Sequence, residues 1–103
     1  LAIQEIVERE LAAPPTLAEL AAQAAMSERS LTRRFAAATG SNLRRYVATL
    51  RRELAAFLLR TGRQPLDHIA DECGYGSVSA LSRAFSAGHG CSPLQYRAQH
   101  RTR

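Results

Sequence analysis

The stretch LRRYVATLRRELAAFLLRT, from Leu43 to Thr61, decides the fold, because it is the longest uninterrupted helical pattern in the chain. Its apolar residues recur at intervals of three and four, which places them on one face of a helix. These residues are Leu43, Tyr46, Val47, Leu50, Leu54, Phe57 and Leu58. Ala55 and Leu59 lie off this face and predict a second, narrower contact face. We expect a helix buried on two sides to join two bodies.

Flanking residues set the expected length of this helix. Asn42 is a suitable N-cap, and Gly62 is a suitable residue at which a helix ends. The helix is therefore predicted to run over 43–61, roughly 28 Å at 1.5 Å per residue.

Length and composition favour an all-α protein. The 103 residues, 46% of them hydrophobic, are enough for one modest core or for two small cores that share a helix. Helix formers dominate, and no alternating strand pattern extends beyond a few positions. No apolar run approaches the length of a membrane span, and the chain does not begin with a signal-peptide pattern. We expect a soluble, intracellular domain.

The positive charge is concentrated in the middle of the chain. All 14 basic residues are Arg, and the formal net charge is +5. Nine of these Arg fall in residues 27–63, which contain only two Glu, whereas residues 1–26 contain four Glu and one Arg. A basic middle segment of this kind is typical of a surface that binds a polyanion, and Arg suits phosphate and guanine edges.

Two pairs of short helices flank the long helix. A first helix is expected over 1–11. Thr16 and Glu19 form a capping-box pattern that begins a second helix, which ends near Ala24. After a tight turn, Ser27 begins a third helix that ends at Thr39-Gly40. Two short helices joined by such a turn have the form of a helix-turn-helix.

The same pattern returns after the break at residues 62–65. A short helix carrying Leu66, Ile69, Ala70 and Cys73 is followed by the turn Gly74-Tyr75-Gly76 and by a helix that begins at Ser77. Ser27, Leu31, Phe35, Gly40 and Tyr46 recur 50 residues later as Ser77, Leu81, Phe85, Gly90 and Tyr96. One extra residue in the second turn shifts the preceding match, so that Ala21 corresponds to Ala70. A last helix is expected from Pro93 to about His100, with Leu94 and Tyr96 packing back on the core and residues 101–103 frayed.

This arrangement resembles the DNA-binding domain of AraC/XylS-type bacterial transcription regulators. The matching residues in the second motif are Ile69-Ala70, Cys73-Gly74-Tyr75, Ser77, Arg83, Phe85, Gly90, Ser92-Pro93 and Tyr96-Arg97. Those in the first motif and the long helix are Ser27, Leu31, Arg33, Phe35, Gly40, Arg51, Ala55, Leu58 and Leu59. The resemblance covers nearly the whole chain, and it implies a transcription regulator whose sensor domain lies outside this sequence.

Two departures from the family pattern concern the second motif. Family members usually carry an aromatic pair where this chain has Ala80-Leu81. They also carry Lys or Arg soon after the second Phe, where this chain has Ser86-Ala87-Gly88. We therefore expect the second recognition helix to hold DNA less firmly than the first.

The candidate DNA-binding residues follow from the outward faces of the two second helices and from the start of the long helix. Arg29 and Arg33 are four residues apart and point away from Leu31 and Phe35, and Arg83 occupies the place equivalent to Arg33. The full set is Arg29, Ser30, Thr32, Arg33, Arg44, Arg45, Ser79, Ser82 and Arg83. Arg44, Arg45, Arg51 and Arg52 are candidates for phosphate contacts. Of these, Arg51 is interpreted as structural, because it lies near the buried face and can pair with a carboxylate such as Glu19 or Asp71. Leu31, Phe35, Leu81 and Phe85 are predicted to be core residues.

Other functional classes fit the sequence less well. No spacing suggests a catalytic triad or paired carboxylates, so we expect neither enzyme activity nor a cofactor. Cys73 is interpreted as a small buried hydrophobe, and a metal site is rejected because His89 and Cys91 lack two further ligands nearby. A helical module that binds an acidic protein partner remains an alternative, and RNA binding is disfavoured by the lack of outward aromatic residues.

The resemblance implies a cytoplasmic, nucleoid-associated protein whose partners are double-stranded DNA and RNA polymerase, with an effector acting only through the absent sensor domain. The fragment is expected to be monomeric, because one chain already carries two reading heads. Major-groove segments on one face of DNA recur every 34 Å or so, and a spacer of roughly 28 Å comes close to this once the width of the two bodies is included. The spacing therefore predicts two short DNA elements about 10 base pairs apart, unless the DNA bends to meet the second head.

Overall fold

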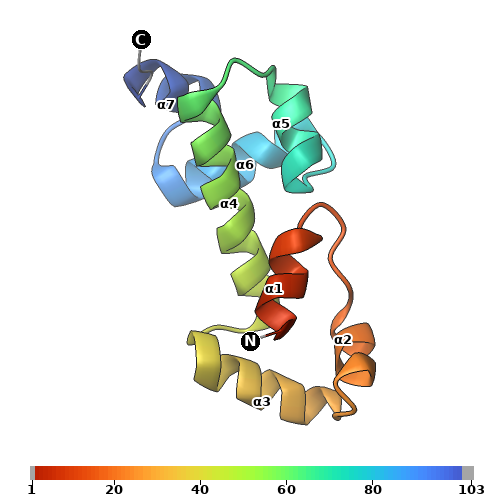
Figure 1. Cartoon of the computed structure of the whole chain (residues 1–103). Helices are drawn as coiled ribbons and strands as arrows, with labels where there is room; N and C mark the ends of the chain where they lie inside the picture. The colour runs from red at the N-terminus through yellow and green to blue at the C-terminus, as the bar shows by residue number, and fades with distance from the viewer. Residues whose placement is uncertain (1, 101–103) are drawn as a thin grey trace. The chain divides into compact units, whose positions relative to one another are not determined.

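The computed structural model describes residues 2–100, and within them the fold is all-α, as predicted. Seven helices follow one another without any strand in these residues (Figure 1). They are α1 (Ala2–Arg9), α2 (Leu17–Gln23), α3 (Glu28–Thr39), α4 (Leu43–Thr61), α5 (Leu66–Cys73), α6 (Val78–His89) and α7 (Pro93–His100). The predictions for Leu1 and for residues 101–103 lie outside the described residues.

Two compact units divide the chain inside α4, between Leu50 and Arg51. The first unit contains α1, α2, α3 and the first part of α4, and the second contains the rest of α4 with α5, α6 and α7. The predicted linker helix is therefore continuous over its 19 residues, and each unit uses a part of it.

The core of the first unit is formed by the inward faces of its helices. Leu31 and Phe35 of α3 are buried, as predicted. They cluster with Ile3, Val7, Leu20 and Ala21, and partly buried residues of α4 pack against this cluster, namely Leu43, Tyr46, Val47 and Leu50. The apolar face predicted for the start of the long helix is thus confirmed.

The core of the second unit confirms the second contact face predicted for α4. Leu54 and Leu58 of the predicted main face also pack against it, but Phe57 of that face does not. Ala55 and Leu59, which the sequence pattern places on a narrow second face, are fully buried, and they cluster with Leu81 and Phe85 of α6. Phe57, which the same pattern places on the main apolar face, is 50% exposed. The reason is geometric: at about 100° per residue, Phe57 points roughly 160° away from both Ala55 and Leu59.

The last helix also differs in one position. Tyr96 packs against the core, but Leu94, which was expected to pack back as well, is 59% exposed. Pro93 takes the buried position in the first turn of α7, and its immediate neighbour is therefore turned towards solvent.

The internal repeat is visible in the contacts of the two units. In the first, the rings of Phe35 and Tyr46 meet edge to face with centroids 5.1 Å apart. In the second, Phe85 and Tyr96 meet in the same way, also at 5.1 Å. Each pair fastens a recognition helix to the helix that follows it.

The two helix-turn-helix turns share one hydrogen-bonding pattern. The Met26 N–H donates to the Ala21 carbonyl at 2.9 Å, and the Tyr75 N–H donates to the Ala70 carbonyl at 2.8 Å. The residue before each donor is left-handed, Ala25 with φ of 56° and Gly74 with φ of 90°. These bonds confirm the match of Ala21 to Ala70, so that Gly76 is the extra residue of the second turn.

The left-handed conformation of Ala25 predicts an unusual response to glycine. A left-handed conformation costs a residue with a Cβ about 1 to 2 kcal/mol, which exceeds the entropic cost of glycine. We expect Ala25→Gly to raise the free energy of unfolding by up to about 1 kcal/mol and Gly74→Ala to lower it by about as much. Urea denaturation followed by circular dichroism measures both.

The matched control is Ala22→Gly, which lies inside α2 and should lower the free energy of unfolding by about 1 kcal/mol. If Ala25→Gly were as destabilising as Ala22→Gly, Ala25 would not be left-handed in solution.

Candidate nucleic-acid interface

The first recognition helix, α3, begins at a capped serine. The Ser27 Oγ accepts a hydrogen bond from the Ser30 N–H at 3.1 Å, and Gly40 ends the helix with φ of 74°. Since Leu31 and Phe35 are held in the core, the opposite face of α3 is turned to solvent.

The sequence-predicted residues of α3 lie on or beside this face. Arg29, Thr32 and Arg33 are exposed, while Ser30 is half-buried at its edge. Arg34 is exposed too, although it stands next to Phe35 and was not predicted as a contact. It stands one position from the core residue Phe35 and was therefore left out, although charged side chains are rarely buried and its residue type already favoured exposure.

The second recognition helix, α6, is built in the same way. The Ser77 Oγ accepts from the Ala80 N–H at 3.1 Å, and Gly90 ends the helix with φ of 74°. Ser79 and Arg83 are exposed and Ser82 is half-buried. Both helices therefore direct the predicted polar residues away from a core that holds a Leu and a Phe.

Charge differs between the two recognition helices. Three Arg and one Glu lie in α3, whereas Arg83 is the one Arg or Lys of α6. A further cation reaches α6 from α4: a Cβ built on Gly88 would lie 2.6 Å from the Arg52 Cδ. The Arg52 side chain thus crosses α6 where glycine leaves space, and it brings positive charge to the segment 86–88 that lacks its own.

The first turn of α4 presents two more Arg. The Asn42 Oδ1 accepts from the Arg45 N–H at 2.8 Å, which confirms Asn42 as the N-cap. Arg44 and Arg45 are exposed beside this helix N-terminus, where free N–H groups favour an anion.

The equivalent turn in the second unit, at the start of α7, is uncharged. Fifty residues after Arg44 and Arg45 stand Leu94 and Gln95. The Gln95 Oε1 accepts from the Ser92 N–H at 2.8 Å, and the Ser92 Oγ accepts from the Gln95 N–H at 3.1 Å. This capping box closes the turn by itself, so the basic pair belongs to the first unit alone.

Two Arg of the second unit are engaged inside it. The Arg97 Nη2 donates to the Gln64 carbonyl at 2.7 Å, and its Nε donates to the Leu59 carbonyl at 3.4 Å. The Arg60 Nη1 donates to the Tyr96 hydroxyl at 3.0 Å. These bonds give Tyr96 and Arg97 a structural role, in which they join α7 to the end of α4.

Cys73 is a core residue, as predicted. This last residue of α5 is fully buried in the core of the second unit, and burial raises the pKa of its thiol to about 11. The charge of Glu72 raises this pKa further and that of Arg51 opposes the rise. The thiol is therefore neutral at pH 7.

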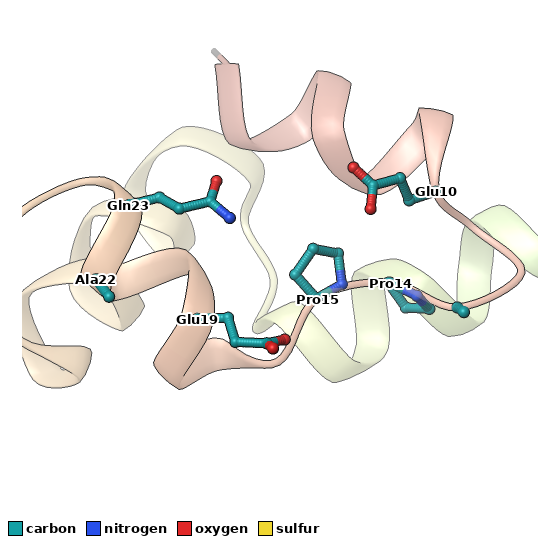
Figure 2. A pocket seen from close by; sticks show the side chains of 7 residues that line it. Glu10, Pro14, Pro15, Glu19, Ala22 and Gln23 are labelled. Atoms are coloured by element: carbon teal, nitrogen blue, oxygen red, sulfur yellow. The ribbon is translucent and has the colours of Figure 1, made fainter.

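One hollow, of about 540 Å³, lies in the first unit (Figure 2). It is lined by Glu10, Ala13, Pro14, Pro15, Glu19, Ala22 and Gln23. The Glu19 Oε1 accepts from the Thr16 N–H at 2.8 Å, so this carboxylate serves the cap of α2. Two carboxylates at its wall oppose the approach of phosphate, and the hollow does not belong to the basic surface.

Residues 2–100 offer neither a metal site nor a membrane span. Within that range no three His, Cys, Asp or Glu side chains gather in a group suited to a metal ion. No helix there has both the length and the apolar character that a membrane span requires.

Comparison with known proteins identifies the arrangement. A family model described as a helix-turn-helix domain matches residues 20–99. A putative AraC-like transcription regulator of Streptomyces antibioticus is 48% identical over 82 residues, and the HTH-type transcriptional activator RhaR of Klebsiella pneumoniae is 33% identical over 91. These alignments cover 80% and 88% of this chain but only 27% and 32% of the two regulators, so the chain spans about a third or less of their length.

Solved structures agree with this relationship. The DNA-binding domain of AdpA, a global transcriptional factor, in complex with a target DNA, has a TM-score of 0.87 and 35% identity, covering 95% of this chain and 88% of that one. The C-terminal domain of the response regulator AraT from Geobacillus stearothermophilus has a TM-score of 0.89 and 26% identity, covering 99% and 85%. The chain therefore belongs to the AraC-type family of helix-turn-helix DNA-binding domains.

Proposed function

We propose that this chain binds double-stranded DNA at a specific sequence through α3 and α6 and thereby regulates bacterial transcription. The observation that carries the proposal is the pair of capped recognition helices, each of which buries a Leu and a Phe and exposes an Arg on the opposite side. This Arg lies four residues after Arg29 in α3 and four residues after Ser79 in α6. The complex of the similar AdpA domain with a target DNA supports it.

Base contacts are assigned to the outward residues of the two helices. In α3 these are Arg29, Thr32 and Arg33, and in α6 they are Ser79 and Arg83. Ser30 and Ser82, which are half-buried, contact DNA at the edges of the same helices. Arg44 and Arg45 hold phosphates from the start of α4.

The whole regulator does more than this segment. Because the chain spans 27% of the Streptomyces regulator it resembles, we assign effector sensing to another region of the protein. The same proposal includes contact of the whole regulator with RNA polymerase at promoters in the cytoplasm. It also includes that the fragment itself binds DNA as a monomer. Sedimentation of the complex with one duplex tests the last point, since a required dimer would contradict the use of two heads in one chain.

The outward Arg of each recognition helix should determine sequence preference. We expect Arg33→Ala and Arg83→Ala each to cost about 1 to 3 kcal/mol at the specific site, with relaxed preference at one base pair. Arg34→Ala, next to Arg33 but beside the core positions, is the matched control and should leave that preference unchanged. Competition gel shifts with single-base variants of the site measure the effect. Equal weakening on specific and random duplexes would make Arg33 and Arg83 phosphate contacts instead.

The Arg pair of α4 should act on affinity without regard to sequence. The Arg44→Ala, Arg45→Ala double variant is expected to weaken binding to all duplexes and to reduce the salt dependence of log K by about one for each phosphate that is no longer neutralised. Arg9→Ala, an exposed Arg of α1, is the control and should change neither. Fluorescence anisotropy over a salt series measures the slope. A wild-type slope near zero would favour an acidic protein as the partner.

The continuity of α4 predicts the layout of the site. One helix of 19 residues supplies core residues to both units, so the heads should read two elements about 10 base pairs apart, centre to centre. Five extra base pairs between the elements would turn the second to the other side of the duplex, and affinity should fall to that of one head. Five base pairs inserted outside the elements are the control. Unchanged affinity after the central insertion would show that α6 does not read DNA.

A further inference from the structure

Val78 is a large apolar side chain at an unusual place, the first residue of α6. It is 36% exposed and takes no part in the core cluster of the second unit, which includes Leu81 and Phe85 of the same helix. A β-branched residue contributes little to helix stability, so helix propensity does not account for it. Its exposed part is available for a contact outside the chain.

The location of Val78 suggests which contact. Ser77 caps the helix immediately before it, and Ser79 and Arg83, the assigned base contacts, follow on the same end of α6. Ser82 lies four residues further along, one turn above Val78 on the same side. A recognition helix reaches base edges with its N-terminal residues, and an apolar side chain there meets the C5 methyl group of thymine.

The first unit has different chemistry at the equivalent position. Fifty residues before Val78 stands Glu28, the first residue of α3, which is exposed. A carboxylate at that place accepts a hydrogen bond from the amino group of cytosine but has no affinity for a methyl group. The two heads therefore differ in kind at the first helical position, in addition to the difference in charge described above.

We propose that Val78 is a specificity-determining residue of the second head and that it reads the C5 methyl group of a thymine. The proposal rests on the proposed function, because it assigns a base contact to the same helix. It explains why α6 has only one Arg: part of its sequence preference comes from apolar contact instead of charge.

Replacement of thymine by deoxyuridine tests this directly, since the two bases differ only in the methyl group. Selection from a random duplex pool first recovers the site, and each thymine of the second element is then replaced singly by deoxyuridine. With the wild-type chain, one position should lose about fourfold in affinity, the value for one buried methyl group. With Val78→Ala the same replacement should cost clearly less, because the shorter side chain has less apolar contact with the methyl group, whereas Val78→Ile should keep the full effect.

Glu28→Ala is the matched control and should leave the deoxyuridine effect in the second element intact. Thermal unfolding of Val78→Ala should match the wild type, because the side chain lies outside the core. If no deoxyuridine position affects wild-type binding, or if the effect is undiminished in Val78→Ala, the assignment of Val78 is wrong while DNA binding stands. If selection recovers no site at all, the proposed function itself fails.

Discussion

The burial of a Leu and a Phe, four residues apart on each recognition helix, is the constraint on which the rest of the structure depends. Leu31 with Phe35, and Leu81 with Phe85, occupy the centres of two small cores. Once these side chains are inside, the rotation of each helix is determined, and every outward residue follows from it. The edge contacts with Tyr46 and Tyr96 then position the next helix, so the same pair orients both the surface and the connection.

The two units share a framework but distribute charge differently. The first carries three Arg on α3 and an Arg pair at the start of α4, while the second carries one Arg on α6 and a neutral capping box at the start of α7. Arg52, lying across Gly88, partly restores positive charge to the second. A duplicated framework with unequal surfaces suits an asymmetric DNA site, to which the first unit contributes the larger share of the positive charge.

Much of this structure was predictable from local signals. The caps Thr16, Ser27, Asn42 and Ser77 predicted helix starts correctly, since a cap acts on its own N–H groups. The errors concern choices made by distant residues. Phe57 and Leu94 match an apolar pattern, yet both are exposed. The second unit instead buries the narrower predicted face of α4, with Ala55 and Leu59, and in α7 it buries Pro93. Local sequence could not predict the hydrogen bonds of Arg60 and Arg97 within the second unit, or the path of Arg52 over Gly88. These contacts join residues more than 30 positions apart.

The division of the chain inside α4 has a thermodynamic consequence. Since α4 is the last helix of one unit and the first of the other, neither unit possesses a complete set of helices of its own. If one unit loses its packing, its part of α4 loses the neighbours that stabilise it as a helix. The helix then frays towards the other unit, because helix formation propagates from residue to residue. The shared helix thus makes the two heads cooperative in folding, although their cores are separate.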